Sequence, residues 1–184
     1  MTDNVAVLVG SLRKASFSRK LALAADGLAP ESLSLGIVEI GDLALYDEDL
    51  EAEAPASWVR FRAQMRAAQA VLFVTPEYNR SVPGLLKNAI DVGSRPYGQS
   101  VFSGKPAGVI SVSPGAMGGF GANHHLRQSL VFLDMPTLQQ PEAYIGGAAS
   151  LFDEAGQIAN PGTREFVSKY MATFAGWVER HVKG

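Results

Sequence analysis

Four side chains near the start of the chain have the types and spacing that would bind a phosphate group. They are Ser11, Arg13, Ser16 and Ser18, and they follow Gly10, where a short apolar run ends and a helical pattern begins. Backbone N–H groups at a helix start attract an anion, and hydroxyls with a guanidinium add strong hydrogen bonds to it. The pattern therefore predicts a site for a phosphate monoester or a nucleotide phosphate.

This loop differs from the two common phosphate-binding loops. It contains neither G-x-G-x-x-G nor G-x-x-x-x-G-K-[ST], so neither a Rossmann dinucleotide site nor a Walker NTPase site is predicted. The guanidinium of Arg13 suits a terminal dianionic phosphate better than a pyrophosphate bridge. The alternative interpretation is an ordinary turn between a strand and a helix, with a serine as the helix cap.

Two more unusual loops follow later apolar runs. Residues 76–84 form a polar stretch bracketed by prolines, which could offer backbone groups to the edge of a planar heterocycle. Residues 114–121 contain four glycines within seven positions, which would let the backbone approach a ligand closely. A flexible surface loop without a ligand is the alternative for this last segment. Three such loops at one edge of a sheet would predict a planar nucleotide cofactor.

Alternating apolar runs and helical patterns predict how these loops are positioned. The predicted strands cover residues 5–9, 35–40, 70–75 and 107–113, with a weaker fifth at 135–138 that continues near 143–145. Helical periodicity fills the segments between them and continues to the end of the chain. We predict an α/β fold, a flavodoxin-like doubly wound five-stranded parallel sheet in the order 2-1-3-4-5. A ligand would then lie at the carboxyl ends of strands 1, 3 and 4.

Composition excludes several classes of protein. Residues 1–184 suit one domain, and 47% of them are hydrophobic, which is enough for a sizeable core. The net charge of −2 and the lack of a basic stripe argue against a nucleic-acid partner. Without cysteine there is no disulfide, no thiolate nucleophile and no cysteine-based metal site. No leader or membrane-spanning run stands out, so we expect a soluble cytoplasmic protein.

Two polar clusters are not predicted to hold a metal ion. The acidic run at 47–53 is interpreted as a solvated loop leading to a helix at Pro55, because its oxygen spacing fits no EF-hand. His124 and His125 are adjacent on a predicted helix and point about 100° apart, so they would seldom share an ion. Contact with another subunit or with solvent is the expected role of this pair.

The three loops together resemble the NADPH-dependent FMN reductase family, and in particular its chromate- and quinone-reductase branch. The first loop is similar to G-S-x-R-x-x-S-x-N-x-x-L, with Ser18 where asparagine is usual. Residues 76–91 match P-E-Y-N-x-S-x-P-G-x-L-K-N-A-I-D without a break, and residues 113–119 match S-x-G-x-x-G-G. His125-Leu-Arg-Gln128 also fits that branch.

The resemblance implies bound FMN, a homodimer or homotetramer, and a set of cofactor-binding residues. Four of these would hold the FMN phosphate, namely Ser11, Arg13, Ser16 and Ser18. The isoalloxazine would be lined by Pro76, Glu77, Tyr78 and Asn79 on one side, with Ser113, Gly115 and Gly118 near its other edge. Phe17 is included among the cofactor-binding candidates, although packing in the core is its simplest role.

The implied reaction needs no catalytic side chain, because FMN carries the chemistry. Hydride would pass from NADPH or NADH to FMN and then to a small-molecule acceptor, such as a quinone, chromate, an azo compound or a nitro compound, in a ping-pong cycle. Backbone amides near Tyr78 and Asn79 would bond the N5–O4 edge of the flavin. The glycine-rich loop and the helix start after Ser113 would stabilise negative charge at N1–O2.

Other functions stay open at this level. A flavin reductase that releases reduced FMN is one, and Ser18 favours it because a shorter side chain can lose a phosphate contact. A non-enzymatic flavodoxin is disfavoured by Arg13 and by the near-neutral charge. An interaction module that has lost its flavin is disfavoured by the intact second and third loops. Where the family often has tryptophan, this chain has Val92-Gly93, so the preferred acceptor is not determined by the sequence.

Overall fold

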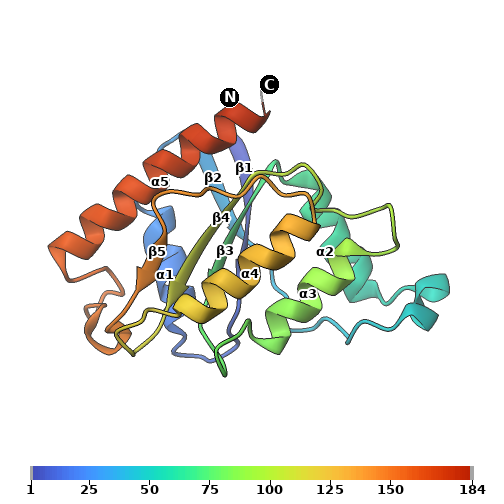
Figure 1. The fold of residues 1–184 in the computed structure, drawn as a ribbon, viewed down its shortest axis with the longest axis horizontal. Helices are drawn as coiled ribbons and strands as arrows, with labels where there is room; N and C mark the ends of the chain where they lie inside the picture. Colours follow the sequence, from blue (N-terminus) through green and yellow to red (C-terminus); the bar gives the residue numbers. More distant parts are fainter. Residues whose placement is uncertain (1, 183–184) are drawn as a thin grey trace.

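The computed structural model describes residues 2–182 and contains one parallel sheet with helices on both faces (Figure 1). The strands are β1 (Asp3–Val9), β2 (Leu33–Ile37), β3 (Ala70–Thr75), β4 (Ala107–Val112) and β5 (Ala143–Ile145). The α-helices are α1 (Phe17–Asp26), α2 (Ala56–Ala67), α3 (Gly84–Ser94), α4 (Phe120–Phe132) and α5 (Pro161–Val182). Short 3-10 helices cover Glu48–Glu53 and Ala148–Ser150.

The strand order is β2-β1-β3-β4-β5 and every pair is parallel, so the predicted flavodoxin-like topology is confirmed. The order reverses direction between β1 and β3, which is the switch point where ligands bind in such sheets. All six residues of β3 and all six of β4 are buried. Continuous apolar runs are expected for strands covered on both faces.

Alternation along the strands divides the core into two halves. In β1, Val5, Val7 and Val9 pack towards α1 and α5, whereas Ala6 and Leu8 pack towards α2, α3 and α4. The two-residue period of a strand sends successive side chains to opposite faces, so one short run supports both helical layers. These layers fix the positions of the loops at the strand ends.

Two predicted strands have different limits in the structure. β2 covers Leu33–Ile37, not 35–40, and Val38 donates one further hydrogen bond to Val7 before the chain leaves the sheet. The predicted main part of the fifth strand, 135–138, is wrong. It contributes only an isolated bridge between Ala107 and Thr137, and the strand itself is the three-residue segment Ala143–Ile145.

A side chain replaces part of the missing fifth strand. The hydroxyl of Tyr170, on α5, accepts a hydrogen bond from the N–H of Val109 and donates one to its carbonyl oxygen, at 2.8 and 3.2 Å. Gly108 leaves the room for this approach, because an added Cβ would lie 2.9 Å from the hydroxyl oxygen. Residues 139–142 can therefore leave the sheet without exposing unpaired groups of β4.

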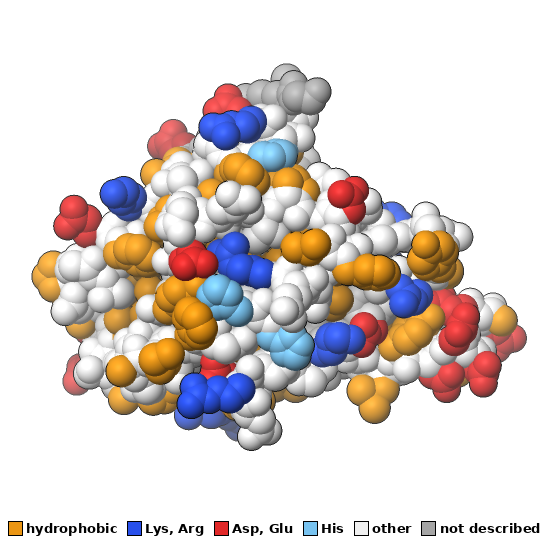
Figure 2. Space-filling model, viewed as in Figure 1, with side chains coloured by type: hydrophobic (Ala, Val, Ile, Leu, Met, Phe, Trp, Pro, Cys, Tyr) orange, Lys and Arg blue, Asp and Glu red, His pale blue; other side chains and the backbone are white. Residues whose placement is uncertain are grey.

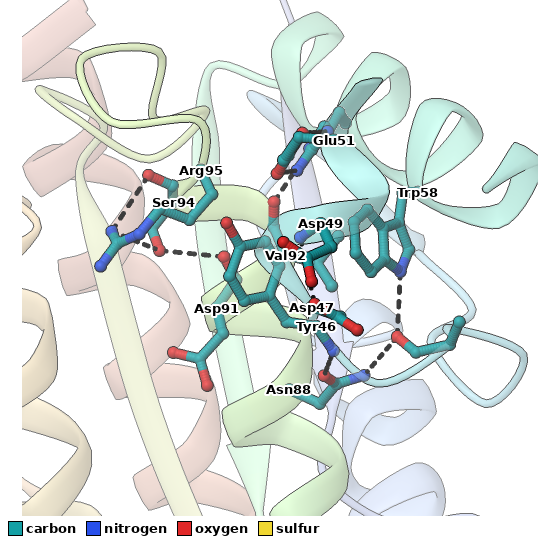
Figure 3. Close-up of polar contacts among 12 residues, drawn as sticks. Tyr46, Asp47, Asp49, Glu51, Trp58, Asn88, Asp91, Val92, Ser94 and Arg95 are labelled. Carbon is teal, nitrogen blue, oxygen red and sulfur yellow. Dashed lines mark hydrogen bonds and ion pairs between the residues drawn. The ribbon is translucent and has the colours of Figure 1, made fainter. Parts of the chain in front are cut away.

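The segment between β2 and α2 is held against α2 and α3 by polar contacts (Figure 3). Asn88 accepts from the N–H of Tyr46 and donates to the carbonyl of Ala44, which also accepts from the indole N–H of Trp58. The acidic run was predicted to be a solvated loop, but one of its side chains is largely buried. Glu51 makes a two-point ion pair with Arg62 at 3.0 and 2.6 Å, and only 17% and 7% of these side chains are exposed.

No helix within residues 2–182 is both long and apolar enough to cross a membrane.

Candidate cofactor site

A cleft of about 170 Å³ lies at the carboxyl ends of β1, β3 and β4, where the three unusual loops meet. The side chains around it come from all three loops and are Ser11, Arg13, Ser16, Phe17, Ser18, Pro76, Glu77, Tyr78, Val112, Ser113 and Pro114. The convergence expected from the strand order is therefore present. Of the predicted cofactor-binding residues, Asn79, Gly115 and Gly118 do not line this cleft.

Ser16 caps α1 and also lines the cleft. Its backbone is extended, with φ −63° and ψ 122°, and its Oγ accepts a hydrogen bond from the N–H of Arg19 at 3.1 Å. The capping role considered as an alternative is thus real, and it leaves the hydroxyl hydrogen for a ligand. Capping and phosphate binding are compatible in this residue.

Ser18 is buried in the first turn of α1, and only 1% of its surface is exposed. Within residues 2–182 its hydroxyl has no hydrogen-bond partner, although it faces the cleft. The first turn of α1 also contains no acidic residue. A buried hydroxyl without a partner beside an uncompensated helix N-terminus suits an anion.

Arg13 lies at the outer rim of the cleft above Phe17. Its guanidinium carbon is 4.8 Å from the centre of the Phe17 ring, and Nη2 donates to the carbonyl of Ala15 at 2.7 Å. These two contacts orient the guanidinium, and the other nitrogens stay free to bind an anion. Phe17 is half-buried, so it contributes to both the core and the cleft.

The second loop forms a tight hairpin between Tyr78 and Ser81. Their backbone N–H groups donate to each other's carbonyls at 3.1 and 2.9 Å, and φ is +52° at Asn79 and +64° at Arg80. Positive φ at both central positions defines a type I′ turn. The amide of Tyr78 is therefore engaged within the loop, so the hydrogen bond expected from this amide to a flavin edge would compete with the turn.

Glu77 has a role that the sequence did not indicate. Its Oε2 accepts a hydrogen bond from the N–H of Ala122 at 3.0 Å, in the first turn of α4, and its Oε1 lies 3.8 Å from Arg80. The cap position of α4 is Gly119, which has no capping side chain. The expectation that the start of α4 stabilises ligand charge is weakened, because a carboxylate already occupies it.

The third loop reaches the cleft only through its first residues. Val112, Ser113 and Pro114 line it, and two of these were missed although they flank Ser113 in the sequence. Gly118 instead packs on β5, where an added Cβ would lie 2.5 Å from the carbonyl carbon of Tyr144, and its φ is +59°. Packing within the chain therefore explains why this position is glycine.

An aromatic cluster covers the outer side of this third loop. The Nε2 of His124 lies 2.9 Å from the hydroxyl of Tyr144, and the His124 ring is 4.3 Å from that of Phe120. Burial, followed by the hydrogen bond and negative charge of Glu142, raises the pKa of Tyr144 to about 12. His125 points elsewhere, with Nδ1 2.7 Å from the Oγ of Ser81. Each histidine thus connects α4 to a different neighbour.

Comparison with known proteins places this chain in a family. Residues 4–150 match the model of the family described as NADPH-dependent FMN reductase. The chain belongs to this family. The resemblance seen in the three loops is therefore confirmed over most of the sequence.

Two relatives and a solved structure illustrate the family's range. A quinone reductase of Pseudomonas putida is 68% identical over 177 residues, which cover 96% of this chain and 95% of the relative. A 2-hydroxy-1,4-benzoquinone reductase of a Burkholderia species is 45% identical, with 97% of each chain covered. The structure of FerB, a flavoenzyme NAD(P)H:(acceptor) oxidoreductase of Paracoccus denitrificans, has a TM-score of 0.93 at 42% identity and covers 98% of this chain and 99% of its own.

The cleft of this FMN reductase family member fits FMN chemically. Hydroxyls, a guanidinium and a helix N-terminus without acidic residues form one end, as a dianionic phosphate requires. The other end combines apolar walls at Pro76 and Val112 with the hydroxyl of Ser113, as a planar ring with polar edges requires. Ser11, Arg13, Ser16 and Ser18 would hold the phosphate, and the loops after β3 and β4 would hold the ring.

Proposed function

We propose that this protein is an FMN-dependent NAD(P)H oxidoreductase that reduces quinones. When bound, FMN accepts a hydride from NADPH or NADH and passes two electrons to the acceptor. The names of the relatives agree with this proposal. Chromate, azo compounds and nitro compounds are further proposed acceptors, because they can take electrons from the same reduced flavin.

The observation that carries the proposal is the anion end of the cleft. Ser18 offers a buried hydroxyl that no other described residue binds, beside Ser16 at the start of α1 and below Arg13. A phosphate bound there would extend the attached ring along the ends of β3 and β4. Tyr78, 57% exposed, stands at the open rim, where a second planar molecule can enter.

The chain's own residues orient the reactants and do not transfer protons in the hydride step. Within residues 2–182, Glu77 is the only carboxylate that lines the cleft, and its Oε2 accepts a hydrogen bond from the N–H of Ala122. Among the described residues around the cleft there is no histidine, cysteine or lysine. One open rim serves both the nicotinamide and the acceptor, which supports a ping-pong order.

The visible spectrum of protein purified without added flavin tests this function. We expect a yellow protein that bleaches with NADPH or NADH under anaerobic conditions, regains colour when a benzoquinone is added, and releases FMN on denaturation. Protein that neither binds FMN nor oxidises NAD(P)H when FMN is supplied would contradict the proposal.

A flavin reductase that releases reduced FMN is the second candidate. It is favoured by the exposure of Arg13 at the phosphate end and by the short side chain of Ser18. Gel filtration of the reduced protein separates the two. Flavin that stays with the protein supports the quinone reductase, and flavin that elutes separately supports the release of FMN as a product.

We also propose that the chain acts as one FMN-binding domain in the cytoplasm, where NAD(P)H is supplied.

We further propose that it forms a homodimer or homotetramer through α3 and α4. A groove of about 290 Å³ between these helices contains Arg95 and an ion pair within the chain between Lys87 and Asp91 at 2.7 Å, and a two-fold interface would bring two copies of this charged groove together. Val131 and Phe132 beside it are 76% and 75% exposed. Light scattering should give at least twice the monomer mass, and Phe132→Asp should lower it. A wild-type monomer would contradict this proposal.

A further inference from the structure

The hairpin that lines the cleft is attached to α4, and this attachment involves residues outside the cleft. Tyr78 lines the cleft, and Ser81, at the other end of the same type I′ turn, faces α4. Two mutual backbone hydrogen bonds join Tyr78 and Ser81. Because a two-residue turn has little freedom, a constraint on Ser81 also constrains Tyr78.

His125 supplies that constraint. Its Nδ1 lies 2.7 Å from the Oγ of Ser81, and this is its one hydrogen bond among the described residues. The ring lies on the solvent side of α4, where Figure 2 shows histidine side chains at the surface. A core role therefore does not explain this side chain, whereas the contact with the loop does.

Gly121 shows that the loop approaches α4 closely over more than one contact. An added Cβ at this position would lie 2.9 Å from the carbonyl oxygen of Arg80 and 3.0 Å from Oε2 of Glu77. Its φ is not positive, so the backbone itself does not require glycine. Glycine is unfavourable within a helix, and the close approach of the loop gives the physical reason for it here.

We propose that Ser81, His125 and Gly121 are positioning residues for the reaction in the cleft. Together they hold the 76–81 loop against the first turns of α4, so that Pro76, Glu77 and Tyr78 form a fixed wall for the flavin ring. This inference rests on the proposed function, since it concerns the same cleft. It assigns a role to α4, none of whose residues lines that cleft.

The first test is a double-mutant cycle between Ser81→Ala and His125→Ala, read as the dissociation constant of FMN from quenching of flavin fluorescence. Each single change should weaken FMN binding about three- to tenfold, and the double variant should be no weaker than either, because one hydrogen bond is lost in all three. His125→Asn should bind FMN more tightly than His125→Ala and nearly as tightly as wild type, since the asparagine amide can place a polar atom near the position of Nδ1.

Two further variants separate positioning from general destabilisation. His124→Ala is the matched control, because this neighbour bonds Tyr144 and not the loop, and it should leave FMN affinity unchanged. Gly121→Ala should weaken FMN binding, because the added Cβ would lie 2.9 Å from the carbonyl oxygen of Arg80 and push the loop away from α4.

Additive losses in the cycle, equal losses in His124→Ala and His125→Ala, or a Gly121→Ala variant that binds FMN as tightly as wild type would each overturn the inference. These readouts need only FMN binding. A wild-type protein that binds FMN but is not reduced by NAD(P)H would contradict the proposed function and leave the test of the loop attachment intact.

Discussion

The N-termini of α1 and α4 lie at the same edge of the sheet but are used in opposite ways. α1 begins after β1, is capped by Ser16 and has no acidic residue in its first turn, while the hydroxyl of Ser18 faces the cleft. α4 begins after β4, has Gly119 at its cap position, and receives the carboxylate of Glu77 on the N–H of Ala122. One terminus is open to an external anion, and the protein itself fills the other.

The difference follows from electrostatics that both helices share. Each N-terminus carries unsatisfied N–H groups and a partial positive charge that stabilise a nearby anion. At α4 that anion is an internal carboxylate, which ties the loop after β3 to the helix. At α1 the first turn contains no acidic residue, so we expect a ligand to supply the anion. The cofactor is thus expected to complete α1 as Glu77 completes α4.

The largest expected effect comes from Arg13→Ala. Removing the guanidinium should weaken FMN binding roughly ten- to a hundredfold, because a hydrogen bond to a charged group contributes about 1.5–3 kcal/mol. Equilibrium titration of the apoprotein with FMN measures this. Lys14→Ala removes an adjacent exposed cation that does not line the cleft and should have little effect. Equal losses in both variants would mean that only general positive charge matters at α1.

An intermediate effect is expected for Glu77→Ala. Loss of the carboxylate leaves the N–H of Ala122 without its partner, so the free energy of unfolding of the apoprotein should fall by about 1–2 kcal/mol. Urea denaturation measures it. Glu154→Ala, which removes an exposed carboxylate, should leave the stability unchanged. If Glu77→Ala were equally neutral, the start of α4 would not depend on this carboxylate.

The smallest effect is expected for Ser18→Ala, and it sharpens the contrast between the two termini. The apoprotein should keep its stability, because this hydroxyl has no protein partner within residues 2–182. FMN binding should weaken about fivefold, the equivalent of about 1 kcal/mol for one hydrogen bond. A loss of apoprotein stability as large as that of Glu77→Ala would show that the Ser18 hydroxyl binds within the protein, and this would contradict an N-terminus of α1 that is left for a ligand.

Much of the fold could be predicted because the central strands carry strong signals. β3 and β4 are continuous apolar runs, and their predicted limits agree with the structure to within a residue. The edges were less predictable. β5 is only three residues long, and the contact that completes β4 comes from Tyr170, which is far away in the sequence. Hydrophobic periodicity is a property of short sequence windows, so it does not predict contacts between residues far apart in the sequence.

The loops of the candidate site also differ in how far the sequence could predict their contacts. The residue types of the first loop predict an anion site, with a serine-capped turn as the alternative, and the structure shows that Ser16 does cap α1 while these side chains line one cleft. For the second loop, the sequence indicated polar contacts with a ligand. The structure instead directs the Tyr78 amide to Ser81 and the Glu77 carboxylate to α4.

The sequence by itself determined the class of fold, the three loops and the family, because each depends on local patterns of residue types, and the alternation of strands and helices favoured the observed strand order. Tertiary structure alone decided how the polar groups of those loops are divided between ligand and protein. A hydrogen bond depends on distance and direction, and Glu77 reaches Ala122 only because β3 and β4 lie side by side. Within residues 2–182 the same fold gives the hydroxyl of Ser18 no protein partner, so the N-terminus of α1 faces the cleft without an internal anion.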